Sequence, residues 1–231
     1  FMVYFGTGKY LEDGDRVPNS SPVNTFYGIW DKPVSSGAIT GSATAAVTRN
    51  DLLPQTLDTA SVAGTTARSV TNTPITWRTG SSGSCPSDGS GTCLGWRVDL
   101  KDATSPVIGE MSVSNPVLIG GTLPRIIFTT LIPETAASCS FGGTSWLMEL
   151  NPRNGGRFSE ALLDVNGDAT YDLISAGNPA VGMKSTTGIL SQPVVIRDPA
   201  NNKIIKGLSG STGAITTNKQ KGGTKPDGAR I

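Results

Sequence analysis

Short apolar runs that end in turn-forming residues are the feature that most limits what this chain can fold into. Their β-branched and aromatic residues favour strands. Turn pairs such as Asp13-Gly14, Asn154-Gly155 and Asn166-Gly167 separate them. Only "SEALLD" (159–164) approaches a helical pattern. The sequence therefore predicts an all-β fold with strands near 2–7, 26–31, 38–48, 69–77, 95–100, 115–120, 125–130, 145–150, 192–198, 203–210 and 214–219.

The size and charge of the chain narrow the function classes. Its 231 residues are enough for one large β domain or two small ones. With 19 basic and 18 acidic residues, the net charge of +1 gives no electrostatic reason to expect nucleic acid or an anionic membrane surface as a partner. The longest apolar runs are too short for a membrane-spanning helix. Since the sequence opens directly in a candidate strand, we expect it to be a piece of a longer exported protein.

A weak internal repeat suggests how the strands are arranged. "SNPVLI" (114–119) resembles "SQPVVI" (191–196), and each precedes a turn and a second strand, "RIIFTT" or "KIIKGLSG". "MVYFGTG" at the start looks like another copy of that second strand, and the aromatic strands "FYGIWDK" and "SWLMEL" follow two of the copies. Such a glycine-punctuated unit is typical of a β-propeller blade, with "SSGSCPSDGSGTC" and "DVNGDATYD" as insertions between strands. An irregular β-sandwich is the alternative fold.

The three cysteines are consistent with an exported protein. Cys85 and Cys93 flank a short segment rich in serine and glycine, which a disulfide would close easily. A disulfide there would contribute about 2–3 kcal/mol to the free energy of unfolding. Two unrelated thiols are the alternative. Cys139 is left over, and three states stay open for it: free, paired with a segment outside this sequence, or the true partner of one of the other two.

Several patterns argue against an enzyme. Histidine is absent, which removes the commonest general base and the serine and cysteine nucleophile systems that depend on it. "FGTGKY" lacks the spacing of a phosphate-binding loop, and "CSFGGTSW" lacks the G-x-S-x-G elbow of a hydrolase. The tryptophans could form a sugar-binding platform, but packing between blades is the commoner use of a large ring inside an apolar strand. They are Trp30, Trp77, Trp96 and Trp146.

The stretch "DVNGDATYD" is the one candidate ligand site. It places Asp164, Asn166, Asp168, Thr170 and Asp172 at positions 1, 3, 5, 7 and 9 of a loop. Calcium takes six to eight oxygen ligands, and a tight loop supplies them by turning alternate side chains inward, with a main-chain carbonyl at position 7. Three carboxylates packed this closely repel one another, and a nearby cation would offset that repulsion. The spacing therefore predicts a calcium site at these five residues.

The stretch departs from a complete calcium-binding EF-hand loop at two positions. Ser175 stands where a bidentate Glu belongs, and Ala169 stands where Gly allows the sharp turn. Ala169 costs free energy if its backbone must be left-handed. An Asx-type turn without an ion is the alternative interpretation.

A series of motifs follows in one order along the chain: "VYFGTGKYL", "FYGIWD", "LLPQTL", "GWRVDL", "SNPVLIGG", "DVNGD" and "GILSQPVVI". This order resembles the PilY/PilC family of type IV pilus tip-associated adhesins. The resemblance runs from about residue 1 to about residue 213 and implies the C-terminal propeller region of that family. Because the family propeller has more blades than this chain can supply, we expect an all-β fold made of its later blades, with long inter-strand insertions. Residues 1–218 would form that propeller part, and residues 219–231 a flexible C-terminal tail.

The resemblance also implies a function. It implies a non-enzymatic adhesin and assembly protein, exported to the cell surface, pilus tip or outer membrane and, in some members, dependent on calcium. Its partners would be pilin or minor pilins, a host or abiotic surface, and the remainder of the same propeller. One departure is Met111, which follows Glu110 where the family tends to have a basic residue.

Two other functions stay open. A quinone- and calcium-dependent propeller dehydrogenase would need a complete ring of blades around inward polar ligands. A purely structural module would leave the binding surface to another region of the protein.

Overall fold

The computed structural model describes residues 1–18, 22–31, 46–79, 83–102, 107–134, 142–174, 176–198 and 200–223. Within these ranges the helices are two short 3-10 turns, η1 (Asp13–Arg16) and η2 (Arg49–Asp51). "SEALLD" (159–164) forms no helix, and its two leucines are buried. None of the described helices has the length and apolar character needed to cross a membrane.

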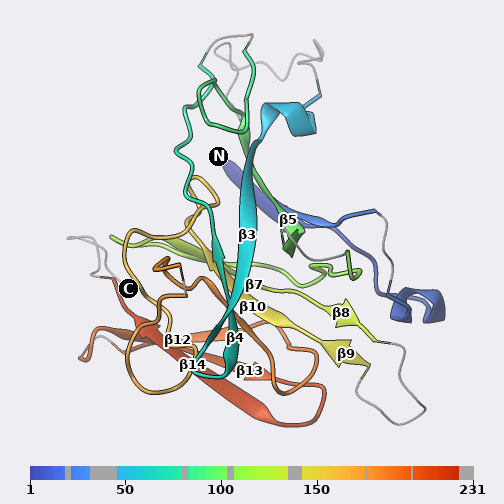
Figure 1. The fold of residues 1–231 in the computed structure, drawn as a ribbon, viewed down its shortest axis with the longest axis vertical. Coiled ribbons are helices and arrows are strands. Elements are labelled where there is room, and N and C mark those ends of the chain that lie inside the picture. The colour runs from blue at the N-terminus through green and yellow to red at the C-terminus, as the bar shows by residue number, and fades with distance from the viewer. Residues whose placement is uncertain are drawn as a thin grey trace.

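A nine-stranded sheet forms most of the structure (Figure 1). Its strands run in the order β1-β2-β5-β3-β4-β11-β10-β7-β6, and neighbours are antiparallel except for the parallel pair β3 and β5. The bounds are β1 (Met2–Gly6), β2 (Thr25–Trp30), β3 (Leu53–Val62), β4 (Thr65–Val70), β5 (Gly95–Asp102), β6 (Val117–Ile119), β7 (Arg125–Thr129), β10 (Trp146–Leu150) and β11 (Gly182–Lys184).

Two smaller sheets complete the described fold. One pairs β8 (Ile132–Pro133) with β9 (Gly143–Thr144). The other has the order β12-β13-β14, with bounds Val194–Asp198, Lys203–Ser209 and Ile215–Lys221. Because β14 continues to Lys221, residues 219–221 belong to a strand, and the prediction that the tail begins at 219 is wrong at these positions. The rest of the predicted tail, from residue 224 on, lies outside the described residues.

The internal repeat corresponds to repeated hairpins. "SNPVLI" and "SQPVVI" lead into the antiparallel pairs β6–β7 and β12–β13. β1 pairs with the aromatic strand β2, as β7 pairs with the aromatic strand β10. The predicted strand at 38–48 lies mostly outside the described residues. The predicted strand at 69–77 is misplaced, because β4 begins at Thr65 and ends at Val70.

The hairpin of β3 and β4 connects the two halves of the large sheet. β3 pairs with β5 on one side and with β4 on the other, and β4 pairs with β11. Its turn is made by Ala63 and Gly64, both with positive φ (46° and 85°). Two left-handed residues give the tight turn whose twist matches that of the flanking strands. The long strand β3 stands upright in the centre of Figure 1.

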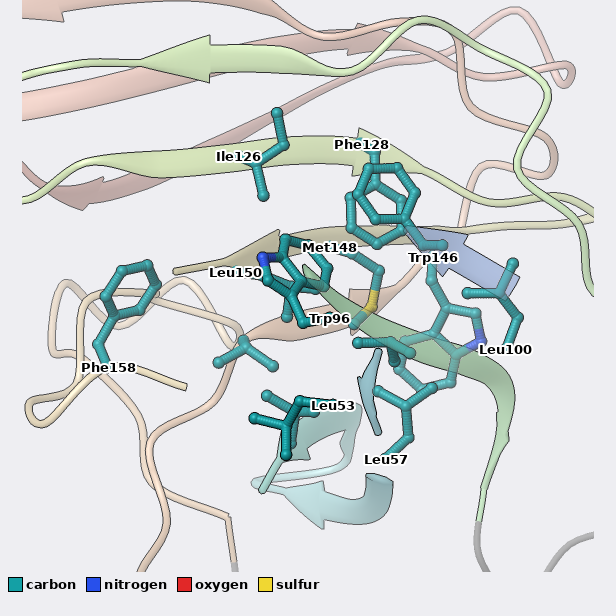
Figure 2. Packing of buried hydrophobic residues seen from close by; sticks show 14 of the residues in the cluster. Leu53, Leu57, Trp96, Leu100, Ile126, Phe128, Trp146, Met148, Leu150 and Phe158 are labelled. Carbon is teal, nitrogen blue, oxygen red and sulfur yellow. The ribbon is translucent and has the colours of Figure 1, made fainter. Parts of the chain in front are cut away.

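The main core lies where side chains of β2, β3, β5, β7 and β10 meet (Figure 2). Phe26 stacks on Phe128 with 3.8 Å between ring centroids. Trp96 is fully buried, and its indole nitrogen donates to the carbonyl of Pro152 at 2.9 Å. Trp96 and Trp146 therefore pack in the core, as predicted.

The other two tryptophans lie nearer the surface. Trp30 and Trp77 are half-buried and meet edge to face, with 5.4 Å between ring centroids. Beside them, Cys85 and Cys93 form a disulfide with 4.8 Å between their Cα atoms, which joins the pair expected from the sequence. Cys139 lies outside the described residues.

A buried ion cluster joins the three-stranded sheet to the large one. Glu149 of β10 accepts from Arg125 of β7 at 3.0 Å and from Lys206 of β13 at 2.7 Å. Burial lowers the pKa of Lys206, while the neighbouring carboxylate of Glu149 acts in the opposite direction. Around the cluster, Ile127 and Leu147 of the large sheet pack in one apolar group with leucine and isoleucine side chains of β13. The contact between the sheets is thus mostly apolar and contains one buried cluster of charged side chains, Arg125, Glu149 and Lys206.

We predict that Glu149→Gln lowers the free energy of unfolding much more than Lys206→Met. Glu149→Gln leaves two buried cations without their carboxylate, and such losses cost about 3–5 kcal/mol. Lys206→Met keeps the Arg125–Glu149 pair and replaces a buried ammonium group by an apolar chain, so we expect a change within about 1 kcal/mol. Urea denaturation of both variants measures the difference. Equal losses would mean that the carboxylate is not the centre of the contact.

Candidate functional site

The candidate loop 164–172 starts from a segment that lies along the outer edge of β14. The main-chain N–H of Asp164 donates to the carbonyl of Lys219 at 3.3 Å. One residue earlier, Leu163 forms a bridge with Gln220, and the N–H of Lys221 donates to Leu162 at 2.9 Å. The first residue of the loop is therefore held as if it ended a short extra strand of the three-stranded sheet.

The loop closes on itself at its base. The N–H of Asp172 donates to the carbonyl of Leu163 at 2.9 Å, and the N–H of Val165 donates to the carboxylate of Asp172 at 2.7 Å. Asp172 also accepts from the N–H of Ala180 at 3.0 Å through its carbonyl. A small apolar cluster packs at this base. Its buried members are Ala67, Leu163, Val165, Ile174 and Ala180.

Carboxylates inside the loop accept from its own main chain. Asp164 accepts from Gly167 at 2.7 Å and from Ala169 at 3.0 Å. Asp168 accepts from the N–H of Thr170 at 2.8 Å. Hydrogen bonds from Thr170, and then from Asn166, lower the pKa of Asp168. The hydrogen bonds of the Asx-type alternative are thus present in the structure.

Three of the five predicted ligands also meet at one point. The amide nitrogen of Asn166 donates to Asp168 at 3.0 Å and to Asp172 at 3.4 Å. Burial raises the pKa of Asp172, and the charges of Asp168 and Asp164 raise it further. Across the described ranges, however, no three acidic or cysteine side chains converge in an arrangement able to hold a metal ion. The structure thus brings Asn166, Asp168 and Asp172 together. The carboxylate of Asp164 instead accepts hydrogen bonds from main-chain N–H groups of the loop.

The residues present fit a calcium ion in their chemistry. The loop offers three carboxylates, one amide and the main-chain carbonyls, all of them the hard oxygen donors that calcium prefers. In the structure, the NH₂ group of Asn166 donates to the carboxylates of both Asp168 and Asp172. Calcium binding would require the amide oxygen of Asn166 in place of this nitrogen.

The backbone of Ala169 is left-handed, the conformation in which an alanine costs free energy. Its φ is +70°, in the left-handed region, where a Cβ atom costs about 1–2 kcal/mol. The N–H of Ala169 donates to Asp164, so the strained backbone also serves the loop's hydrogen bonding.

Sequence reasoning missed a buried ion pair near the base of the loop. Arg68 of β4 donates through both terminal nitrogens to Glu110, each at 2.7 Å, and its guanidinium lies over the ring of Trp146 at 3.8 Å. The main-chain carbonyl of Arg68 accepts from the N–H of Val181, next to Ala180 at the loop base. Met111, which departs from the family pattern, is buried and bridges to Leu131.

We predict that Ala169→Gly raises the free energy of unfolding by about 0.5–1 kcal/mol. Glycine has no penalty in the left-handed region, and this gain exceeds the extra freedom it gives the unfolded chain. Thermal or urea unfolding in excess chelator measures the effect. Ala214→Gly is the control, since Ala214 is also exposed and does not have a positive φ. That control should lose stability. A loss for Ala169→Gly as well would contradict the assigned backbone conformation.

Comparisons with known proteins add the following. The family model of the PilY1 beta-propeller domain matches residues 1–69. The type IV pilus biogenesis factor PilY1 of Pseudomonas aeruginosa is 31% identical over 225 residues, which are 95% of this chain and 17% of that protein. A PilY1 homolog of Xylella fastidiosa is 32% identical over 190 residues, 81% of this chain and 11% of that protein. The chain thus spans less than a fifth of these relatives.

A solved structure is similar to nearly the whole chain. The crystal structure of the Pseudomonas aeruginosa PilY1 C-terminal domain matches with a TM-score of 0.70 and 25% identity. The match covers 96% of this chain and 42% of that one. The predicted fold class, an all-β chain that forms part of a β-propeller, is therefore confirmed.

Proposed function

We propose that this chain, which belongs to the PilY1 family, is part of a factor for type IV pilus biogenesis. The single observation that carries the proposal is the similarity to a PilY1 factor over 95% of the chain. In this proposal the protein is exported and acts at the bacterial cell surface, at the pilus tip or the outer membrane. The chain belongs to the propeller of that protein.

We propose that the protein works by binding and not by catalysis. Its partners would be pilin or minor pilins, a host or abiotic surface, and the rest of the propeller. The sequence contains no histidine, and the two most buried glutamates serve the fold. Glu110 is paired with Arg68, and Glu149 with Arg125 and Lys206. These charged side chains stabilise contacts between strands.

Calcium bound in loop 164–172 would modulate this function. The argument is electrostatic: Asp164, Asp168 and Asp172 lie close enough for two of them to raise the pKa of the third. A divalent cation would replace this repulsion by attraction. The loop base contacts both β14 and the residues next to β11. Bound calcium would therefore also stabilise the contact between the two sheets.

We predict that calcium raises the unfolding midpoint of the chain. For a site present only in the folded state, calcium at 100 times its dissociation constant adds about 2.7 kcal/mol. Thermal unfolding in excess calcium and in excess chelator measures this shift. No shift at millimolar calcium would leave loop 164–172 as an acidic turn.

The variant Asp168→Ala should abolish the calcium response and leave the metal-free protein about as stable. Its matched control is Asp88→Ala. Both aspartates are exposed, and each accepts from the N–H two residues further on, Thr170 for Asp168 and Ser90 for Asp88. Asp88 lies in the disulfide-closed segment and should leave the response intact. A full response of Asp168→Ala would place the ion elsewhere.

The pilus function is tested with the full-length protein in its own bacterium. A strain without the protein should assemble fewer surface pili, and the wild-type gene should restore them. With Asp168→Ala in that gene, we expect pilus number or surface attachment to fall, while Asp88→Ala behaves as wild type. Attachment that falls at an unchanged number of pili would support an adhesin role. Normal piliation and attachment of the strain lacking the protein would contradict the proposal.

A further inference from the structure

The outer face of the three-stranded sheet carries apolar side chains that remain exposed. Val194 and Ile196 of β12 are 66% and 57% exposed. We propose that this outer face, defined by Val194, Ile196 and Ile205, is the docking surface for a further β-sheet of the same protein. The inference rests on the proposed function in one respect, that the chain is part of a larger PilY1-type propeller. It assigns the face of contact and the chemistry of the sheet that binds there.

Both faces of this sheet have apolar positions. Successive side chains of a strand point to opposite faces. Ile204 and Lys206 of β13 are buried on the inner face, which packs on the large sheet below β7 and β10 in Figure 1. Ile205 therefore lies on the outer face, where the register places it opposite Ile196. The consecutive apolar residues Val194–Ile196 are typical of a strand that is buried on both faces.

The internal repeat shows how the corresponding face is covered one hairpin earlier in the chain. Because "SNPVLI" aligns with "SQPVVI", Ile119 of β6 corresponds to Ile196 of β12. In the strands that follow, "RIIFTT" aligns with "KIIKGLSG", so Ile127 of β7 corresponds to Ile205 of β13. Ile119 and Ile127 are 5% and 0% exposed, and they belong to the apolar cluster between the large sheet and the three-stranded sheet. The repeat therefore predicts a further sheet over Ile196 and Ile205.

The comparisons leave room for such a sheet within one protein. The match to the PilY1 C-terminal domain covers 96% of this chain and only 42% of that one. In a β-propeller, sheets stack around a ring, and each sheet packs against its neighbours. The part of the protein outside this chain can thus supply the next sheet. It would pack on the outer face of β12, β13 and β14 as these strands pack on the large sheet.

Two features of the outer face determine the chemistry of its occupant. Gly207 lies opposite Val194, and a Cβ atom built on Gly207 would meet nothing within 4 Å. A side chain of the occupant can therefore fill the space above this glycine. Lys219 of β14 lies opposite Ile205 and is exposed. We expect an occupant with apolar side chains toward Ile196 and Ile205 and a carboxylate within reach of Lys219.

The experiment measures thiol labelling in the purified full-length protein. Ile196→Cys places a thiol in the middle of the outer face. Ser61→Cys is the control, because Ser61 is also exposed and lies in the β3–β4 hairpin, away from this face. A water-soluble maleimide is added in native buffer and in urea, and peptide mass spectrometry follows each thiol separately. Relative to the rates in urea, we expect Ile196→Cys to react at least about tenfold more slowly than Ser61→Cys, because labelling then requires local opening.

Each other outcome overturns the proposal. Equal native rates for the two thiols would mean that nothing in the protein covers the outer face. Protection that disappears on dilution, together with a dimer in sedimentation, would mean that a second copy of the protein covers it. If Ile196→Cys does not fold, Val194→Cys on the same face takes its place. The labelling does not depend on pilus assembly, so an exposed outer face would refute the docking surface and leave the proposed pilus function standing.

Discussion

The fold depends most on one buried carboxylate, that of Glu149. Arg125 and Lys206 reach it from two different strands, and all three side chains are almost entirely removed from water. Taking these charges out of water costs several kcal/mol for each ion, and only their mutual attraction and hydrogen bonds offset that cost. The large sheet and the three-stranded sheet pack in a register that brings both cations to Glu149. Apolar contact alone, which has little directionality, would not select that register.

A second buried pair orients the other side of the same region. Arg68 and Glu110 meet in a two-bond contact over the ring of Trp146. The guanidinium is planar, so stacking and paired hydrogen bonds together fix its orientation. The main chain of Arg68 accepts from Val181, which follows the base of the acidic loop. The base of the loop thus contacts β14 on one side. On the other side it adjoins a residue bonded to β4, the strand that carries the Arg68–Glu110 pair.

The sequence predicts the strands better than it predicts their contacts. Strands with continuous β-branched residues, such as Arg125–Thr129, are found where they were predicted. β3 was missed because polar residues and Pro54 interrupt its apolar positions, and β11 was missed because it has three residues. The ion pairs could not be predicted, since their partners lie 42 residues apart for Arg68 and Glu110 and 57 for Lys206 and Glu149. Their register depends on tertiary packing, which no local pattern encodes.

In the candidate site, too, local features can be read from the sequence and long-range contacts cannot. The alternate spacing of oxygen-bearing residues within the loop is local, and in the structure Asn166 donates to both Asp168 and Asp172. Asn218 lies 54 residues from Asp164 and contacts it only because the segment before the loop pairs with β14. The loop therefore does not behave as an independent insertion on the surface. Its base hydrogen-bonds to β14 and packs beside β11, so the loop is held by both sheets.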